Sequence, residues 1–290
     1  MNRRLQLAWE SRWARPTAAA TFGAVGLLVA SVIVATSIGG GGQAESLRDL
    51  HDHSSTVTLV SVLQGAGFLL LVVPLVYLFR ADAARSERVR RQFLPLIVLA
   101  PIALGAASIL NGAAANQAAD TFANGEATPS LTKRAATGEC NDERREDASA
   151  FHEDFGDGEA ATSACASEKI EDDTAEDAIE STSLRRVGEG VQFGGLIALA
   201  FALVYTCLYA MRVGLLTRFW GSLGMAFGVA SVFGLFQFSA IWFLYLGLLV
   251  AGWLPGGRPP AWASGEAMPW PTPGEKAAKE LEGPDGGGSD

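Results

Sequence analysis

The chain has 290 residues, of which 49% are hydrophobic and 18% are charged, and its formal net charge is −9. Most of this acidity lies in residues 112–186, which hold 18 acidic and 7 basic side chains. Nucleic acid is therefore not expected as a partner, because phosphates require a basic face. The apolar residues fall into uncharged blocks of membrane-spanning length, which predicts an all-α integral membrane protein in contact with the lipid bilayer rather than soluble domains.

Residues 1–16 are predicted to lie on the cytoplasmic membrane surface. They carry four arginines, one glutamate and two tryptophans, and tryptophan rings suit the headgroup level while arginines attract anionic lipid. Residues 17–38 follow as 22 uncharged residues. A cleaved signal peptide is the alternative interpretation, but its apolar region is usually only about 7–15 residues long. We therefore expect a retained first helix.

Residues 17–111 are expected to hold three transmembrane helices, at 17–38, 57–79 and 93–110. The segment 80–91 between the second and third carries five arginines against two acids. An arginine at the bilayer centre costs about 2.5–3.5 kcal/mol on insertion scales, so short arginine-rich loops stay in the cytoplasm. We expect residues 80–91, and with them the N-terminus, to be cytoplasmic.

Prolines and a run of alanines affect the predicted shape and length of the second and third helices. Pro74 and Pro101 predict kinks within the second and third spans. The alanine-rich sequence after the third span can extend that helix to about Phe122.

Residues 112–187 are predicted to form an acidic, partly disordered extracytoplasmic loop, because few large apolar residues are available to build a core. Its end, about residues 168–186, is expected to be helical. Cys140 and Cys165 both lie in this loop, and we take their pairing in a disulfide as a hypothesis, since an extracytoplasmic compartment permits it. Cys207 lies within a span and is expected to pack as a small apolar residue.

Residues 188–254 are expected to hold the fourth, fifth and sixth spans. The fourth is 191–211, and 36 uncharged residues occupy 219–254. A single helix of that length would measure about 54 Å, much more than a bilayer core needs. Two short spans, 219–235 and 240–254, with a turn near 237–239, are more economical, although five spans rather than six stays open.

Small residues mark one face of the predicted fifth span. Gly221, Gly224 and Gly228 are spaced so that a neighbouring helix can approach closely. The tail that follows, 255–290, holds 7 of the 12 prolines, which favours extended chain. Six spans place both termini in the cytoplasm.

Polar side chains in or beside the spans are few. We expect Gln64, Gln192 and Gln237 to form hydrogen bonds between helices, and we find no Asp, Glu, Lys, Arg or His inside the predicted spans. His51 and His53 are two residues apart and do not share a helix face, and residues 152–159 lack the spacing of a calcium loop. No catalytic, cofactor-binding or metal-binding residue is therefore predicted.

Two segments, AMRVGLLTRFWGSLGM (210–225) and GGRPPAWASGEAMPWP (256–271), resemble a family of uncharacterised multi-pass membrane proteins of high-GC bacteria. The resemblance implies an integral protein of the bacterial cell membrane and assigns no activity. It also implies that the turn at 212–218 packs against the PPAW segment at the cytoplasmic face.

These patterns favour a non-enzymatic scaffold or accessory subunit of a membrane assembly. Uncharged interiors and small-residue helix faces fit association with a membrane-protein partner or with further copies of the chain. The alternative is a transporter or channel for a neutral or apolar solute, with a cavity lined by Gln64 and by backbone freed at Pro74 and Pro101. A closely packed bundle would favour the scaffold.

Overall fold

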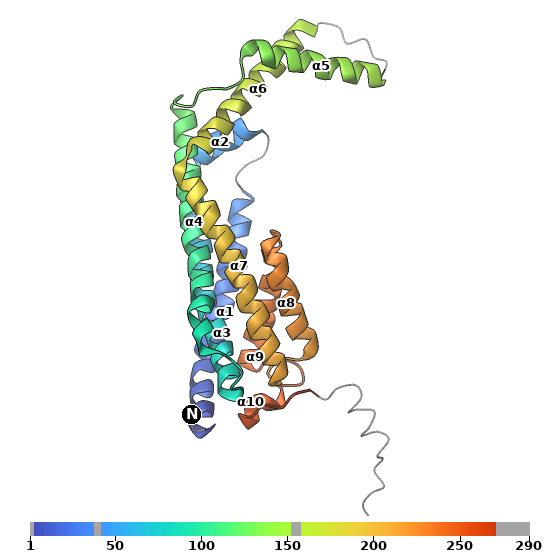
Figure 1. Ribbon diagram of the computed structural model, residues 1–290. Coiled ribbons are helices and arrows are strands. Elements are labelled where there is room, and N and C mark those ends of the chain that lie inside the picture. The colour runs from blue at the N-terminus through green and yellow to red at the C-terminus, as the bar shows by residue number, and fades with distance from the viewer. Residues whose placement is uncertain (1–2, 38–41, 152–157, 271–290) are drawn as a thin grey trace, which may run out of the picture. The chain divides into compact units, whose positions relative to one another are not determined.

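A computed structural model of the chain describes residues 3–37, 42–151 and 158–270, and the regular secondary structure of these residues is helical (Figure 1). This confirms the all-α prediction. The helices are α1 (Arg3–Ala35), α2 (Gln43–Asp52), α3 (Ser54–Arg85), α4 (Leu94–Ala123), α5 (Lys133–Phe151), α6 (Gly158–Ser181), α7 (Ser183–Arg212), α8 (Arg218–Val232), α9 (Phe236–Ala251) and α10 (Pro260–Ser264). A 3-10 turn, Arg91–Phe93, leads into α4.

Four helical segments are long and apolar enough to cross a membrane, judged by length and composition. They are Arg3–Ala35, Ser54–Arg85, Arg91–Ala123 and Ser183–Arg212. They overlap the first four predicted spans and extend beyond them, and the expected extension of α4 to about Phe122 is confirmed. Helices α8 and α9 have 15 and 16 residues, which at 1.5 Å per residue gives only about 22–24 Å against a bilayer core of about 30 Å.

The chain divides into two compact units. Unit 1 comprises Met1–Gly26, Gly67–Ala103 and Phe193–Asp290, and unit 2 comprises Leu27–Ala66 and Leu104–Gln192.

Within unit 1, α8 packs closely against α7 and α9 through its glycines. A Cβ atom added at Gly224 would collide with Trp242 of α9 and Cys207 of α7, and one added at Gly228 would lie 2.9 Å from the Cβ of Leu203. The predicted small-residue face is therefore confirmed, because backbone approach at this distance leaves no room for a side chain.

The turn between α8 and α9 lies at residues 233–235, so the predicted position, 237–239, was wrong. Gly234 has φ +82, a left-handed conformation that glycine adopts without strain. The polar residue Ser239 lies instead inside α9, where it is buried and its hydroxyl donates to the carbonyl of Phe227 at 3.3 Å. A polar side chain that can be satisfied by a neighbouring helix does not have to mark a turn.

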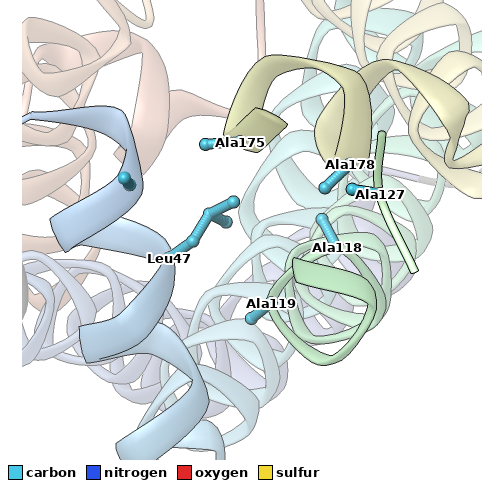
Figure 2. Packing of buried hydrophobic residues seen from close by; sticks show 7 residues of the cluster. Leu47, Ala118, Ala119, Ala127, Ala175 and Ala178 are labelled. Carbon is cyan, nitrogen blue, oxygen red and sulfur yellow. The ribbon is translucent and has the colours of Figure 1, made fainter. Parts of the chain in front are cut away.

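Within unit 2, α2, α4 and α6 pack around a core built mainly of alanine (Figure 2). Its buried members are Ala44, Leu47, Ala118, Ala119, Ala127, Ala175 and Ala178. Helix α5 packs against α6 (Figure 1). Alanines lose no side-chain entropy on burial and let helices approach closely, so few large residues are needed.

The partial disorder expected for residues 112–187 is therefore not found in the described part of that segment, which is mostly helical. Residues 152–157, in its middle, lie outside the described residues. The helical end expected at 168–186 is confirmed by α6 and the start of α7.

Candidate functional site

Arg85, in the last turn of α3, holds a buried ion pair with Glu10 of α1 in unit 1. The Arg85 side chain is fully buried, and that of Glu10 is 5% exposed. Arg85 Nη1 donates to Glu10 Oε1 at 2.5 Å, and Nη2 donates to Glu10 Oε2 at 2.9 Å. This two-point arrangement is the strongest geometry available to a guanidinium and a carboxylate.

The remaining donors of Arg85 bind backbone carbonyls. Nη1 also donates to Ala81 at 3.0 Å, while Nε and Nη2 donate to Ala261 of α10 at 3.2 and 3.0 Å. All five N–H groups of the guanidinium are thus used. Arg85 therefore ties α1 and α3 to the segment after the last long helix, and it has no donor left for a substrate.

Three aromatic rings stack beside this ion pair. Tyr77 lies between Trp9 and Trp262, with ring centroids 5.5 and 5.8 Å from its own and interplanar angles of 24° and 10°. The Tyr77 hydroxyl donates to the Glu10 carbonyl at 3.1 Å, and the Arg85 guanidinium carbon is 5.7 Å from the Trp262 ring centroid. The stack encloses the ion pair in apolar surface, which strengthens its electrostatic attraction.

Asp82, one turn before Arg85, is the exception in this cluster. It is fully buried, and among the described residues neither of its carboxylate oxygens has a hydrogen-bond partner. A buried carboxylate without hydrogen bonds is energetically costly, so Asp82 contributes no stabilising contact of the kind that Glu10 makes.

This cluster corrects the predicted bounds of the first two long helices. Residues 1–16 were expected at the membrane surface and residues 80–91 in a loop. Instead α1 begins at Arg3 and α3 continues to Arg85, so that Glu10, Asp82 and Arg85 are helical and have buried side chains. One signal was available: Glu10 is the single acid among residues 1–16, and a lone acid among arginines indicates a partner.

The segment after α9 docks on the turn between α7 and α8. Trp262 Nε1 donates to Leu215 O at 3.0 Å, and Trp270 Nε1 donates to Leu216 O at 2.8 Å. The Met268 amide donates to Val213 O at 3.0 Å. The expected packing of the PPAW segment against the turn at 212–218 is confirmed.

The glutamines occupy three different settings. Gln192 accepts a hydrogen bond from Asn111 Nδ2 at 2.6 Å, which joins α7 to α4 within unit 2 and confirms the role expected for it. Gln64 is half-buried in α3, and Gln237 is exposed at the start of α9.

The two histidines make separate contacts. His51 Nδ1 lies 3.0 Å from Asp120 Oδ1, and His53 Nδ1 lies 3.0 Å from the carbonyl oxygen of Asp49. No calcium loop was predicted at residues 152–159, and the first six of these residues lie outside the described part of the chain.

Cys140 of α5 and Cys165 of α6 are joined by a disulfide, with Cα atoms 6.1 Å apart. Glu143 lies beside them, close enough for the three residues to resemble a metal site. Metals are bound by thiolates, however, and sulfurs bonded to each other cannot supply them. The residues present here do not fit a metal ion.

Thiol labelling should reveal this bond. In denatured protein without reductant we expect a maleimide reagent to modify Cys207 alone, and after reduction all three cysteines. Cys140→Ser should free Cys165 and give two labelled cysteines without reductant. In the chain-entropy model, loss of the bond lowers the stability of the α5–α6 pair by about 3 kcal/mol. Modification of three cysteines in unreduced wild type would contradict the bond.

Charged side chains form ion pairs and hydrogen bonds on the surface of α5 and α6. Lys169 Nζ lies 2.7 Å from Glu143 and 3.3 Å from Glu139, and the hydrogen bond to Glu143 raises the pKa of Lys169 above its usual value. Asp173 accepts from the Leu131 amide and the Ser130 hydroxyl, each at 2.8 Å. These two hydrogen bonds lower the pKa of Asp173.

The lowered pKa of Asp173 predicts an acid-sensitive contact between the segment before α5 and α6. Because the unfolded carboxyl binds protons more readily, the contribution is complete above the ordinary aspartate pKa of about 3.9 and is lost as pH falls through the lower folded value. We expect Asp173→Asn to melt at a lower temperature than wild type at pH 7, with the difference shrinking at pH 3. An equal difference at both pH values would contradict this assignment.

Every N–H group of the Arg85 guanidinium is hydrogen-bonded to Glu10 or to a backbone carbonyl of the chain. Among the described residues, the one cysteine outside the disulfide is Cys207, which is buried. Comparisons with protein-family models, with curated proteins and with solved structures find no match.

Proposed function

We propose that this chain is a non-enzymatic scaffold or accessory subunit of a membrane assembly. The observation that carries the proposal is the saturation of Arg85, whose five donors all bind groups of the chain itself. Ionisable groups inside membrane proteins commonly mark transport paths, but a transport path needs donors that a solute can reach. A saturated arginine instead holds helices in place.

Close helix packing supports the same proposal. In unit 2, a Cβ added at Gly112 of α4 would collide with Ser61 of α3, and one at Gly65 would lie 3.2 Å from the carbonyl of Gly105. A solute cavity beside Gln64 would need space at this contact. The transport alternative is therefore less well supported than the scaffold.

Purification of the full chain from its native membrane in mild detergent tests the function. A scaffold or accessory subunit should elute as a complex of fixed stoichiometry, with a protein mass well above the 30.4 kDa of one chain. Light scattering coupled to gel filtration measures that mass. A lone chain whose melting temperature rises with a neutral solute would contradict the proposal and support transport.

We further propose six passes through the cell membrane, with both termini in the cytoplasm and α5 and α6 outside. Basic residues support this topology, because the segments proposed as cytoplasmic hold 14 of the 22 and the positive-inside rule counts short loops. Helices α8 and α9 would be the two short spans, accommodated by local thinning of the bilayer.

Reporter fusions test this topology directly. Alkaline phosphatase is active only outside the cytoplasm, so we expect activity when it is fused after Gly125 and none when it is fused after Ser86. A cytoplasmic fluorescent reporter at the same two positions should give the opposite pattern. Activity after Ser86 would invert the topology.

A further inference from the structure

We propose that a groove in unit 1 binds an anionic phosphate ester, and that its occupant is the headgroup of an acidic phospholipid. The groove is formed by α1, α3, the 3-10 turn Arg91–Phe93 and the start of α4, and its volume is about 550 Å³. Ligand-binding clefts commonly measure about 300–1,000 Å³. This proposal is independent of the scaffold role.

Two arginines of the groove have free charges. Arg80 and Arg91 line it and are exposed, and within the described ranges neither is in an ion pair, whereas Arg85 on the same helix has every donor in use. A guanidinium with free donors binds phosphate oxygens at two points. Glu87 is the acidic residue in the lining, so the two arginines leave the groove with a net positive charge.

The position of Arg80 is set by an aromatic ring. Its guanidinium carbon lies 5.7 Å from the ring centroid of Trp9, and Trp9 itself stacks on Tyr77 beside the buried ion pair. The cation–π contact holds the guanidinium face and leaves its edge donors available. Pre-organisation of this kind lowers the entropy cost of binding.

The apolar part of the lining favours a lipid over a soluble phosphate. Phe79, Leu94 and the ring of Trp9 lie in the same groove as the arginines. Both flanking helices, α3 and α4, belong to segments apolar enough to span a membrane. A phosphate flanked by hydrocarbon is the chemistry of a phospholipid at the headgroup level, where basic side chains bind anionic lipid.

Native mass spectrometry of the full chain in neutral detergent tests the proposal. The probes are dioleoylphosphatidylglycerol, dioleoylphosphatidylcholine and inorganic phosphate. We expect phosphatidylglycerol to remain bound and phosphatidylcholine to be lost at the same concentration. Inorganic phosphate should not displace the bound lipid. If phosphate alone binds as tightly as phosphatidylglycerol, the lipid assignment is wrong.

Matched variants separate the groove from general surface charge. Arg80→Gln with Arg91→Gln should weaken phosphatidylglycerol binding about tenfold or more. Arg88→Gln with Arg90→Gln removes the same charge from outside the groove lining and should change binding much less. Equal losses in the two double variants would overturn the proposal.

A third variant keeps every charge and fills the space. Ala84 lines the groove and is exposed, so Ala84→Trp should fold, as judged by unchanged helical circular dichroism, and should lose phosphatidylglycerol. Retention of the lipid by folded Ala84→Trp would show that the groove is not the binding site, even if the arginine variants bind weakly.

Discussion

Replacing Arg85 with glutamine is expected to lower the free energy of unfolding of unit 1 by about 3–5 kcal/mol, the largest effect of any single substitution considered for this chain. The substitution leaves the Glu10 carboxylate buried without its charged partner and removes the hydrogen bonds to the carbonyls of Ala81 and Ala261. Unfolding of the full chain by SDS in mild detergent, followed by circular dichroism, measures the change.

Two further variants show whether the ion pair is the cause. Glu10→Gln should also destabilise, because it leaves the Arg85 charge buried, and the double variant should cost much less than the two single changes together. Asp82→Asn replaces a carboxyl group that is equally buried but has no hydrogen bond among the described residues. We expect stability to stay the same or rise, because no hydrogen bond is lost and the cost of burying a carboxylate is removed. A loss as large as that of Arg85→Gln would show that Asp82 has a role that its contacts do not reveal.

Gly224→Leu is expected to produce the second largest loss, about 3 kcal/mol, by forcing α8 away from its neighbours. The new side chain would occupy the space of Trp242 and Cys207. Displacement of Trp242 would also break the hydrogen bond from its Nε1 to the carbonyl of Trp220, which measures 3.0 Å. The melting temperature and the tryptophan fluorescence of the full chain should both shift.

Gly194→Leu is the matched control for this prediction. Gly194 is also a helical glycine in unit 1, but a Cβ added there meets no atom within 4 Å. Removing the backbone freedom of a helical glycine should leave stability unchanged or raise it by up to about 1 kcal/mol. If Gly194→Leu destabilises the isolated chain as strongly as Gly224→Leu, steric exclusion is not the explanation.

The sequence predictions were correct where they depended on residues close together in the chain, and wrong where a contact with a distant helix decided the structure. The glycine face of α8 follows from the spacing of three residues, and the extension of α4 follows from an alanine-rich run without proline. The turn before α9 was misplaced because Gly234 and the polar residues Gln237 and Ser239 compete as turn signals. Only the neighbouring helix decides between them, by accepting a hydrogen bond from Ser239.

The alanine core of unit 2 shows a second limit of sequence analysis. Alanine is a weak hydrophobic signal, so an acidic segment rich in alanine is easily interpreted as disordered. Leu47 and the alanines around it come from α2, α4, α6 and the segment before α5 (Figure 2). Their burial depends on those segments meeting, which no local pattern predicts.

By itself, the sequence determined the helical class, the long apolar helices and the acidity of the segment between them, because run length and composition are properties of neighbouring residues. Only the tertiary structure decided which charges are buried. Arg85 meets Glu10 across 75 positions of chain and Ala261 across 176. The same arginine could equally have faced water at a membrane surface, and the difference lies in which distant carbonyls and carboxylates the folded helices bring to its five donors.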